Sequence, residues 1–170
     1  MNAISLPSIE AVASLRARLW DAGFRPVQLY SADVTEADGG DPIEPSSRGK
    51  RPRGKNWQER ARLCPPEDAV ARPRSNALNT GILCDGLRVV DIDVDDPTRA
   101  AQMKALAIEM FGEPIIRTRA NSGRCALVYR AAEGQPGKRS TKGPFGKLEV
   151  LGFGEQLQAF GHHYTGATLN

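Results

Sequence analysis

The chain has 170 residues, of which 40% are hydrophobic and 25% charged, and its net charge at neutral pH is +3. This length suits one domain of ordinary size, and the apolar content excludes a globally disordered chain. The mildly basic balance is compatible with a nucleic-acid partner but does not by itself select that class.

Three widely spaced cysteines, Cys64, Cys84 and Cys125, form no C-x-x-C pair. This spacing argues against a structural zinc site and favours a reduced compartment, so we expect a cytoplasmic protein. The N-terminus lacks the pattern of a signal peptide, and the longest apolar runs are too short to cross a bilayer. We therefore expect no membrane association.

The first third of the chain predicts a helix, a strand and a long loop. Residues 8–22 repeat apolar side chains at helical spacing, and Gly23 follows them as a helix stop. Residues 25–30 alternate as a short strand does. Residues 31–55 then form a loop rich in Gly, Pro and Ser. A loop of this length is usually functional or partly disordered.

Basic residues are concentrated at the end of this loop, because residues 48–62 contain seven of the 23 Lys and Arg. Two interpretations stay open: a solvated, flexible insertion, or a basic flap over nucleotide phosphates or a template strand. The spacing of the basic residues by Gly and Pro favours the flap. Its candidate DNA-binding residues are Lys50, Arg51, Arg53 and Lys55.

The middle of the chain predicts two short helices and a hairpin. The helices are expected at residues 56–63 and 66–71. Residues 79–84 and 87–94 read as strands, and the Asp-Gly pair between them is a strong turn signal. We therefore expect these two strands to pair with each other.

The second strand of this hairpin carries a D-x-D motif. Val90 and Ile92 point to one face and Asp91 and Asp93 to the other, because residues two apart on a strand face the same way. Neighbouring carboxylates repel each other unless a cation lies between them, and oxygen ligands suit Mg²⁺ or Mn²⁺. The alternative is a solvated strand end, which is the commoner setting of a D-x-D pair.

A helix is expected next over residues 96–111, with Asp96 as its N-cap and Pro97 at its first position. Its expected apolar face consists of Met103, Leu106, Ala107, Met110 and Phe111. Further strands are expected at residues 115–119, 125–130, 147–151 and 156–160, with a loop at 131–145. Together these elements predict a single α+β domain over residues 1–170, built on one mixed, mostly antiparallel sheet flanked by helices.

Asp91, Asp93 and Glu149 are candidates for a metal clamp of the kind that nucleotidyl transfer requires. Glu149 alternates with Leu148 and Val150, so it lies on one face of its strand. Taken alone, it is an ordinary exposed strand residue. The hypothesis depends on the three carboxylates meeting in space.

The polar turn between the strands at 115–119 and 125–130 is a candidate phosphate site. Its residues Ser122 and Gly123 offer backbone N–H groups, and Arg117, Arg119 and Arg124 offer cations. Taken alone, this is an ordinary turn. It gains weight from its place between the D-x-D strand and the strand of the third acid.

The order of these motifs resembles the bifunctional primase/polymerase (prim-pol) domain of phage and plasmid replication proteins, in the archaeo-eukaryotic primase superfamily. That order is D-x-D, then S-G-R, then a strand acid followed by G-x-G, Q-x-x-A-x-G and H-x-x-T-G. Its most specific segments are NTGI…VVDIDVDDP and GKLEVLGFGEQLQAFGHHYTG. The similarity covers nearly the whole chain.

The resemblance implies an archaeo-eukaryotic primase-like catalytic core that adds nucleotides under the direction of a template. It implies Mg²⁺ or Mn²⁺ held by Asp91, Asp93 and Glu149, with a DNA template or primer and nucleoside triphosphates as substrates. It also implies a phosphate or DNA contact for His163. The chain departs from the family in its second motif, where relatives usually carry a His, and Arg124 is the expected substitute.

Relatives usually continue into a helicase or an accessory region, so we expect either a domain excised from a longer replication protein or a minimal relative, with a replicative helicase as a partner. Two other functions stay open. A degenerate relative would bind nucleic acid or nucleotide without turnover, as the missing His suggests. A metal-dependent nuclease would also use paired acids.

Overall fold

The internal contacts of the chain divide it into two compact units. The first unit comprises Met1–Leu83 and Gln158–Thr168, and the second comprises Cys84–Leu157 and Leu169–Asn170. The residues that the computed structural model describes are 7–63, 74–120, 122–131 and 133–169. The helix expected at 66–71 lies outside them.

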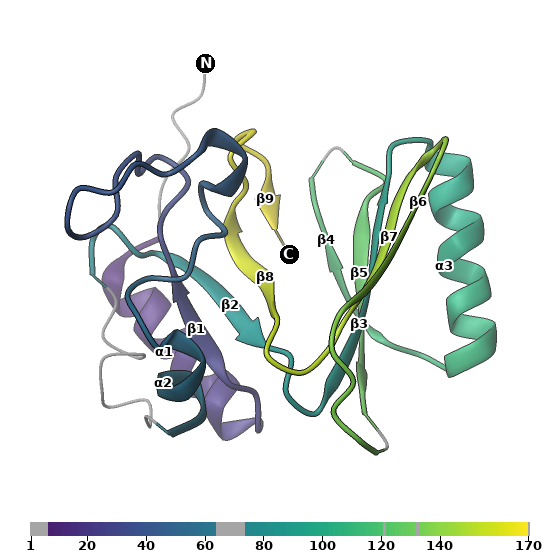
Figure 1. Cartoon of the computed structure of the whole chain (residues 1–170), viewed down its shortest axis with the longest axis horizontal. Helices are drawn as coiled ribbons and strands as arrows, with labels where there is room; N and C mark the ends of the chain where they lie inside the picture. Colours follow the sequence, from purple (N-terminus) through teal and green to yellow (C-terminus); the bar gives the residue numbers. More distant parts are fainter. Residues whose placement is uncertain (1–6, 64–73, 121, 132, 170) are drawn as a thin grey trace. The chain divides into compact units, whose positions relative to one another are not determined.

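Helices and strands alternate irregularly along the chain, and the predicted α+β class is confirmed (Figure 1). The helices are α1 (Ile9–Asp21), the 3-10 helix η1 (Pro45–Ser47), α2 (Trp57–Leu63) and α3 (Pro97–Phe111). The strands are β1 (Pro26–Leu29), β2 (Asn79–Leu83), β3 (Leu87–Val94), β4 (Ile115–Thr118), β5 (Cys125–Arg130), β6 (Arg139–Gly143), β7 (Gly146–Leu151), β8 (Gln156–His162) and β9 (Thr168–Leu169).

The strands form two sheets, whereas one sheet was expected. The four-stranded sheet has the order β1-β2-β8-β9, and the five-stranded sheet has the order β4-β5-β3-β7-β6. The hairpin predicted between 79–84 and 87–94 is therefore wrong, because β2 pairs with β1 while β3 pairs with β5 and β7. The strand after β7, β8, joins the four-stranded sheet as well.

Two consecutive backbone N–H groups explain why β2 and β3 belong to different sheets. The N–H of Leu83 donates to the carbonyl of Arg25, the residue just before β1, and the next N–H, of Cys84, donates to the carbonyl of Glu155. Buried backbone groups must find partners, so this switch of partner fixes where the chain leaves one sheet. The side chain of Asp85 then accepts from the N–H of Gly154, which holds the turn.

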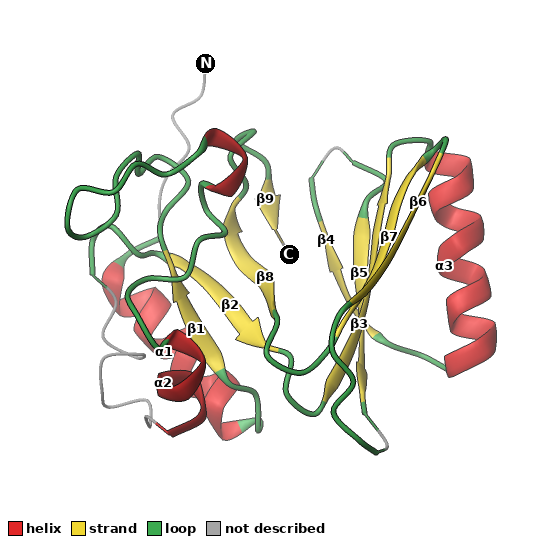
Figure 2. Cartoon of the chain, viewed as in Figure 1, coloured by secondary structure: helices red, strands yellow, loops and turns green. Residues whose placement is uncertain are grey.

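In the second unit, α3 covers one face of the five-stranded sheet, as Figure 2 shows. The side chains of β3 that point to α3 are Val90, Ile92 and Val94, and the apolar residues of β5 join them. Asp96 caps the helix by accepting from the N–H of Arg99 at 2.9 Å, as predicted. One apolar cluster of this unit therefore lies between α3 and the sheet.

The apolar face predicted for α3 is wrong apart from Ala107. The residues that α3 buries fully are Ala100 and Ala107. The large side chains predicted to be buried are instead exposed: Met103, Leu106, Met110 and Phe111. The helix therefore rests on the sheet through small residues, which let its backbone approach closely.

In the first unit, α1 and α2 both pack against β1 (Figure 2). All four residues of β1 are buried. Arg16 of α1 is also fully buried, and its guanidinium donates to the carbonyls of Ala77 and Asn79, both at 2.8 Å, and to the hydroxyl of Thr80 at 3.0 Å. Burial lowers the pKa of Arg16 to about 9, which leaves it charged at neutral pH.

The loop predicted over residues 31–55 is ordered by backbone hydrogen bonds and contains η1. The N–H of Tyr30 donates to the carbonyl of Arg51, and the N–H of Arg53 donates to the carbonyl of Gln28. The basic end of the loop therefore runs beside β1. This pairing favours a fixed basic segment over a flexible insertion.

The loop predicted over residues 131–145 contains a strand that sequence reasoning missed. β6 pairs with β7, yet all five of its residues are exposed. An exposed edge strand carries no apolar alternation, so its sequence gives no strand signal. Over the described part of the chain, no helix has both the length and the apolar character needed to cross a membrane.

Candidate active site

Asp91 and Asp93 lie on the face of the five-stranded sheet that points away from α3. Their strand, β3, turns Val90 and Ile92 toward α3. Because side chains alternate across a strand, the two carboxylates point the other way. Both side chains remain partly accessible to solvent.

Glu149 joins the two aspartates on this face. β7 pairs antiparallel with β3, and Glu149 is the residue directly opposite Asp91, while Lys147 is opposite Asp93. Residues directly opposite each other in such a pair share one face and have Cβ atoms about 4.5–5.5 Å apart. The structure thus places the three predicted acids on one face of the sheet, and we call the surface that they share the acid face.

Three arginines contact the two aspartates of the acid face. Nη2 of Arg117 lies 3.3 Å from Oδ1 of Asp91, and Nη1 of Arg124 lies 2.5 Å from Oδ1 of Asp93. Nη2 of Arg119 lies 3.9 Å from the same oxygen of Asp93. Arg117 on β4 is opposite Ala126 of β5, which is in turn opposite Asp91 of β3, while Arg119 follows β4 and Arg124 precedes β5.

Two lysines share one oxygen of Glu149. Nζ of Lys138 lies 2.8 Å from Oε1, and Nζ of Lys147 lies 2.7 Å from it. Sequence reasoning missed both lysines. The alternation in KLEVL places Lys147 on the same face as Glu149 and would have revealed it. Lys138 gave no signal, because the segment that leads into β6 reads as a loop.

These neighbours change the pKa values of the buried groups. Burial would raise the pKa of Glu149, but the hydrogen bonds from Lys138 and Lys147 outweigh it, and the pKa is lowered. Burial lowers the pKa of Arg117, and the charge of Asp91 opposes that shift. Glu149 is therefore ionised at neutral pH.

The donor set suits a hard divalent cation, whose preferred ligands are carboxylate oxygens. Asp91 and Glu149 lie directly opposite each other on the neighbouring strands β3 and β7, and Asp93 is the next residue of β3 on this face. Within the described residues, however, no three His, Cys, Asp or Glu side chains converge closely enough to hold a metal ion. Each of the three acids contacts an Arg or a Lys, so these basic side chains would have to move before a cation could bind.

The turn predicted to hold phosphate packs on the start of α3. Oγ of Ser122 accepts a hydrogen bond from the N–H of Arg124 at 3.2 Å. A Cβ at Gly123 would lie 3.2 Å from Cα of Pro97, so the turn has little room for a larger residue. The contact between Arg124 and Asp93 places this turn next to the acid face. Phosphate binding by the turn stays a prediction.

Cys125, where the family resemblance expects a His, faces α3 rather than the acid face. The next residue, Ala126, is directly opposite Asp91, so Cys125 must point the other way. Cys125 is 6% exposed, and burial raises the pKa of its thiol. A buried, protonated thiol cannot take the place of a His on the acid face.

Two of the four predicted DNA-binding residues contact acids of their own loop. Nη2 of Arg51 lies 3.8 Å from Oδ2 of Asp41, and its Nη1 donates to the carbonyl of Pro42 at 3.0 Å. Arg53 forms an ion pair with Asp38. These contacts bind the side chains of Arg51 and Arg53 to their own loop.

Lys50 and Lys55 have different surroundings. Nζ of Lys50 lies 5.4 Å from the centre of the exposed Tyr164 ring, within cation–π distance, whereas Lys55 is exposed. The Tyr164 ring also lies against the imidazole of His163, with centroids 4.3 Å apart. An exposed aromatic ring beside a cation is typical of proteins that bind single-stranded nucleic acid, and sequence reasoning missed Tyr164.

His163 is 4% exposed and lies in the first unit. Its Nδ1 lies 2.9 Å from the hydroxyl of Thr165 and accepts from the N–H of the same residue at 3.3 Å. These contacts orient the ring, and little of it faces solvent. A direct phosphate contact by His163 stays a prediction.

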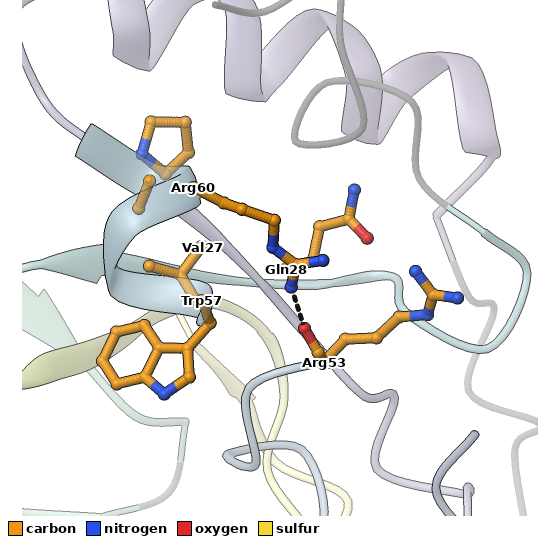
Figure 3. A pocket seen from close by; sticks show the side chains of 7 residues that line it. Val27, Gln28, Arg53, Trp57 and Arg60 are labelled. Carbon is orange, nitrogen blue, oxygen red and sulfur yellow. Dashed lines mark hydrogen bonds between the residues drawn. The ribbon is translucent and has the colours of Figure 1, made fainter. Parts of the chain in front are cut away.

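A small pocket lies between β1 and α2 in the first unit (Figure 3). Arg53, Trp57 and Arg60 line it, and the guanidinium of Arg60 donates to the carbonyl of Arg53 across it. Its volume is about 20 Å³, which is room for about one water molecule. It is too small for a nucleotide base.

A larger hollow of about 990 Å³ lies in the second unit, but not on the acid face. Val90, Val150 and Phe111 line it, and the two valines point to the α3 side of the sheet. Neither of these two pockets is lined by Asp91, Asp93 or Glu149.

Comparison with known proteins gives one result. No curated protein matches the chain. A family model described as bifunctional DNA primase/polymerase, N-terminal, matches residues 17–168. The match spans both units and includes every residue of the acid face.

Proposed function

The chain belongs to the bifunctional DNA primase/polymerase N-terminal family, and from this premise we propose that it catalyses metal-dependent, template-directed addition of nucleotides to a DNA strand. Membership implies a primase- or polymerase-type role with DNA and nucleotides as substrates. The observation that supports the finer proposal is the register between β3 and β7, in which Glu149 is opposite Asp91 and Asp93 is on the same face.

In the proposed reaction, the 3′-oxygen of the strand attacks the α-phosphorus of the nucleotide and forms a new P–O bond. The bond from that phosphorus to the β-phosphate oxygen breaks, pyrophosphate leaves, and the hydroxyl proton passes to solvent. Bound Mg²⁺ or Mn²⁺ would activate the attacking oxygen and neutralise the leaving pyrophosphate. Asp91, Asp93 and Glu149 would hold the cation.

The cations around the acid face would bind the triphosphate. Arg117, Arg119 and Arg124 already lie within ion-pair distance of the aspartates. Their planar guanidinium groups match phosphate oxygens in geometry. The N–H groups at Ser122 and Gly123 would add neutral donors to the same site.

The basic segment of the first unit would bind the DNA backbone through Lys50, Arg51, Arg53 and Lys55. Its backbone is fixed beside β1, and the exposed Tyr164 ring next to Lys50 offers a surface on which a base can stack. In this proposal His163 supports the Tyr164 ring and lies near the DNA phosphates.

Primer extension tests the proposal directly. The protein is incubated with a primed template, deoxynucleoside triphosphates and Mn²⁺, and the double variant Asp91→Asn, Asp93→Asn is compared with the wild type. We expect the wild type to extend the primer and the double variant to lose extension. Asp95→Asn is the matched control, because Asp95 is also paired with Arg124 but lies at the exposed end of the same strand face. Equal extension by the double variant and the wild type would overturn the assignment.

The second candidate function is a module that binds nucleotide or nucleic acid without turnover. Two observations favour it: each acid contacts a basic side chain, and the expected His is replaced by a buried Cys125. The same assay separates the two functions. Retained binding of template with no extension in either Mg²⁺ or Mn²⁺ would favour the binding module, whereas degradation of the primer would indicate a nuclease.

The proposed setting is the replication of a phage or plasmid, with a replicative helicase as a partner. The motif order described above supports this setting. Deletion of the gene from its replicon should then block replication of that replicon, and normal copy number after deletion would refute it.

A further inference from the structure

The ion pairs of Glu149 point to an exchange of partners at the acid face. The Glu149 side chain is only 14% exposed, and both of its ammonium partners, Lys138 and Lys147, contact the same oxygen. A carboxylate held in this way is already neutralised before any ligand binds. A second cation can approach it only if at least one lysine withdraws.

The sheet register places these lysines next to the other acids. Lys147 is directly opposite Asp93 on β3, and Lys142 of β6 is directly opposite Lys147 on the outer side. Lys138 precedes β6 and has the same strand parity as Lys142, so both belong to this face. The edge of the sheet beside Glu149 therefore carries a row of ammonium groups.

The two lysines are better able to change partners than the arginines. Lys138 and Lys147 are 38% and 41% exposed, whereas Arg117 and Arg119 are 14% and 11% exposed. A lysine ammonium is a compact charge on a flexible four-carbon stem, so it can swing by several ångströms without disturbing the sheet. The more deeply buried arginines have less room to move.

We propose that Lys138 and Lys147 leave Glu149 and bind the triphosphate when a divalent cation and a nucleotide enter together, so that cation and nucleotide bind the acid face cooperatively. This inference rests on the proposed function. Without nucleotide, a withdrawn ammonium has no anionic partner and competes with the divalent cation for Glu149. With nucleotide, the phosphate oxygens provide that partner, and the competition ends.

Direct measurement of Mn²⁺ binding tests the exchange without reference to catalysis. Free Mn²⁺ is followed by electron paramagnetic resonance during titration of the full chain, first alone and then with a non-hydrolysable α,β-imido deoxynucleoside triphosphate. After subtraction of the Mn²⁺ that the analogue chelates in a protein-free titration, we expect the wild type to bind Mn²⁺ more tightly when the analogue is present. The double variant Lys138→Gln, Lys147→Gln should bind Mn²⁺ alone about two- to fivefold more tightly per lysine removed, because a competing cation is gone.

The same double variant should bind the analogue more weakly and show less cooperativity between the two ligands. Lys142→Gln is the matched control, because it removes one charge from the same face while the ion pairs of Glu149 to Lys138 and Lys147 stay in place. The variant Lys138→Arg, Lys147→Arg keeps both charges and should behave nearly as the wild type does.

Each outcome decides the proposal. Tighter binding of Mn²⁺ alone, together with weaker binding of the analogue, supports the exchange. Unchanged or weaker Mn²⁺ binding in the Gln variant overturns the exchange while leaving the proposed function intact, provided that Mn²⁺ still binds and Asp91→Asn weakens it. If the wild type binds no Mn²⁺ with or without the analogue, both the exchange and the metal-dependent function are wrong.

Discussion

The two units place their polar groups differently. In the first unit, Arg16 is fully buried and its guanidinium links α1 to the segment that leads into β2. In the second unit, the fully buried core around Ile92 and Leu127 is apolar, and the acidic residues Asp91, Asp93 and Glu149 lie on the opposite face of the sheet. The first unit thus has a charged side chain in its interior, whereas the cluster around Ile92 in the second unit is apolar.

This difference separates stability from chemistry within the second unit. Because the apolar cluster around Ile92 packs on the α3 side, the polar side chains of the acid face can be replaced without opening that cluster. The first unit offers no such separation, since Asn79, which helps to hold Arg16, also bonds Gly49 and His162. We therefore expect polar substitutions to unfold the first unit and to leave the second folded.

Arg16→Met gives the largest expected effect. The change leaves the carbonyls of Ala77 and Asn79 and the hydroxyl of Thr80 without their donor in a buried site. Leaving buried polar groups unpaired in this way costs about 3–5 kcal/mol in the free energy of unfolding. Denaturant unfolding measures it.

Arg18→Met is the control for this prediction, because Arg18 lies on the same helix but is exposed. It should change the free energy of unfolding by less than about 0.5 kcal/mol. If Arg16→Met were as mild as Arg18→Met, the buried guanidinium would not hold the first unit together.

Ile92→Ala should have the next largest effect, and it tests the apolar core of the second unit. Ile92 is fully buried between β3 and α3, so its truncation leaves a cavity. Such a change costs about 2–4 kcal/mol in the free energy of unfolding. Ile115→Ala, at an exposed position of β4, is the matched control and should cost far less. Equal losses at the two positions would contradict the placement of the core.

The elements that could be predicted from the sequence are those with a strong local signal. The bounds of β3 and β5 and the Asp96 cap of α3 agree with the prediction, because alternation and capping depend on neighbouring residues. The exposed edge strand β6 could not be predicted, since pairing with β7 creates it. The Asp85-Gly86 turn was read as a hairpin turn because its sequence does not encode which strands its neighbours will pair with.

The candidate site shows the same limit. The common face of Asp91 and Asp93 follows from two-residue spacing, and their meeting with Glu149 depended on a strand order that only the family resemblance could suggest. Lys138 and its ion pair to Glu149 were beyond sequence reasoning, because Lys138 precedes β6, and the pairing of β6 with β7 has no local signature. The large side chains of α3 were wrongly assigned to the core, because helical spacing alone does not say which side faces the sheet.

Glu149→Gln should give the smallest effect on stability, and its dependence on pH identifies the cause. The pKa of Glu149 is lowered in the folded chain from its ordinary 4.5, because the hydrogen bonds from Lys138 and Lys147 outweigh the effect of burial. The ionised carboxylate therefore stabilises the fold above pH 4.5, and this contribution is lost as the pH falls through the lowered pKa. The two lysines are partly exposed, so we expect the loss at neutral pH to be under about 1 kcal/mol.

The measurement that checks this is the difference in free energy of unfolding between wild type and Glu149→Gln across a pH series. The difference should be constant at neutral pH and shrink toward zero in acid. Glu113→Gln is the control, because Glu113 is exposed and lies outside the acid face; its difference should stay near zero throughout. If the difference at Glu149 did not change with pH, the packing of its side chain and not its charge would account for the loss of stability. The ion pairs of Glu149 with the two lysines would then contribute less to the free energy of unfolding than their short distances imply.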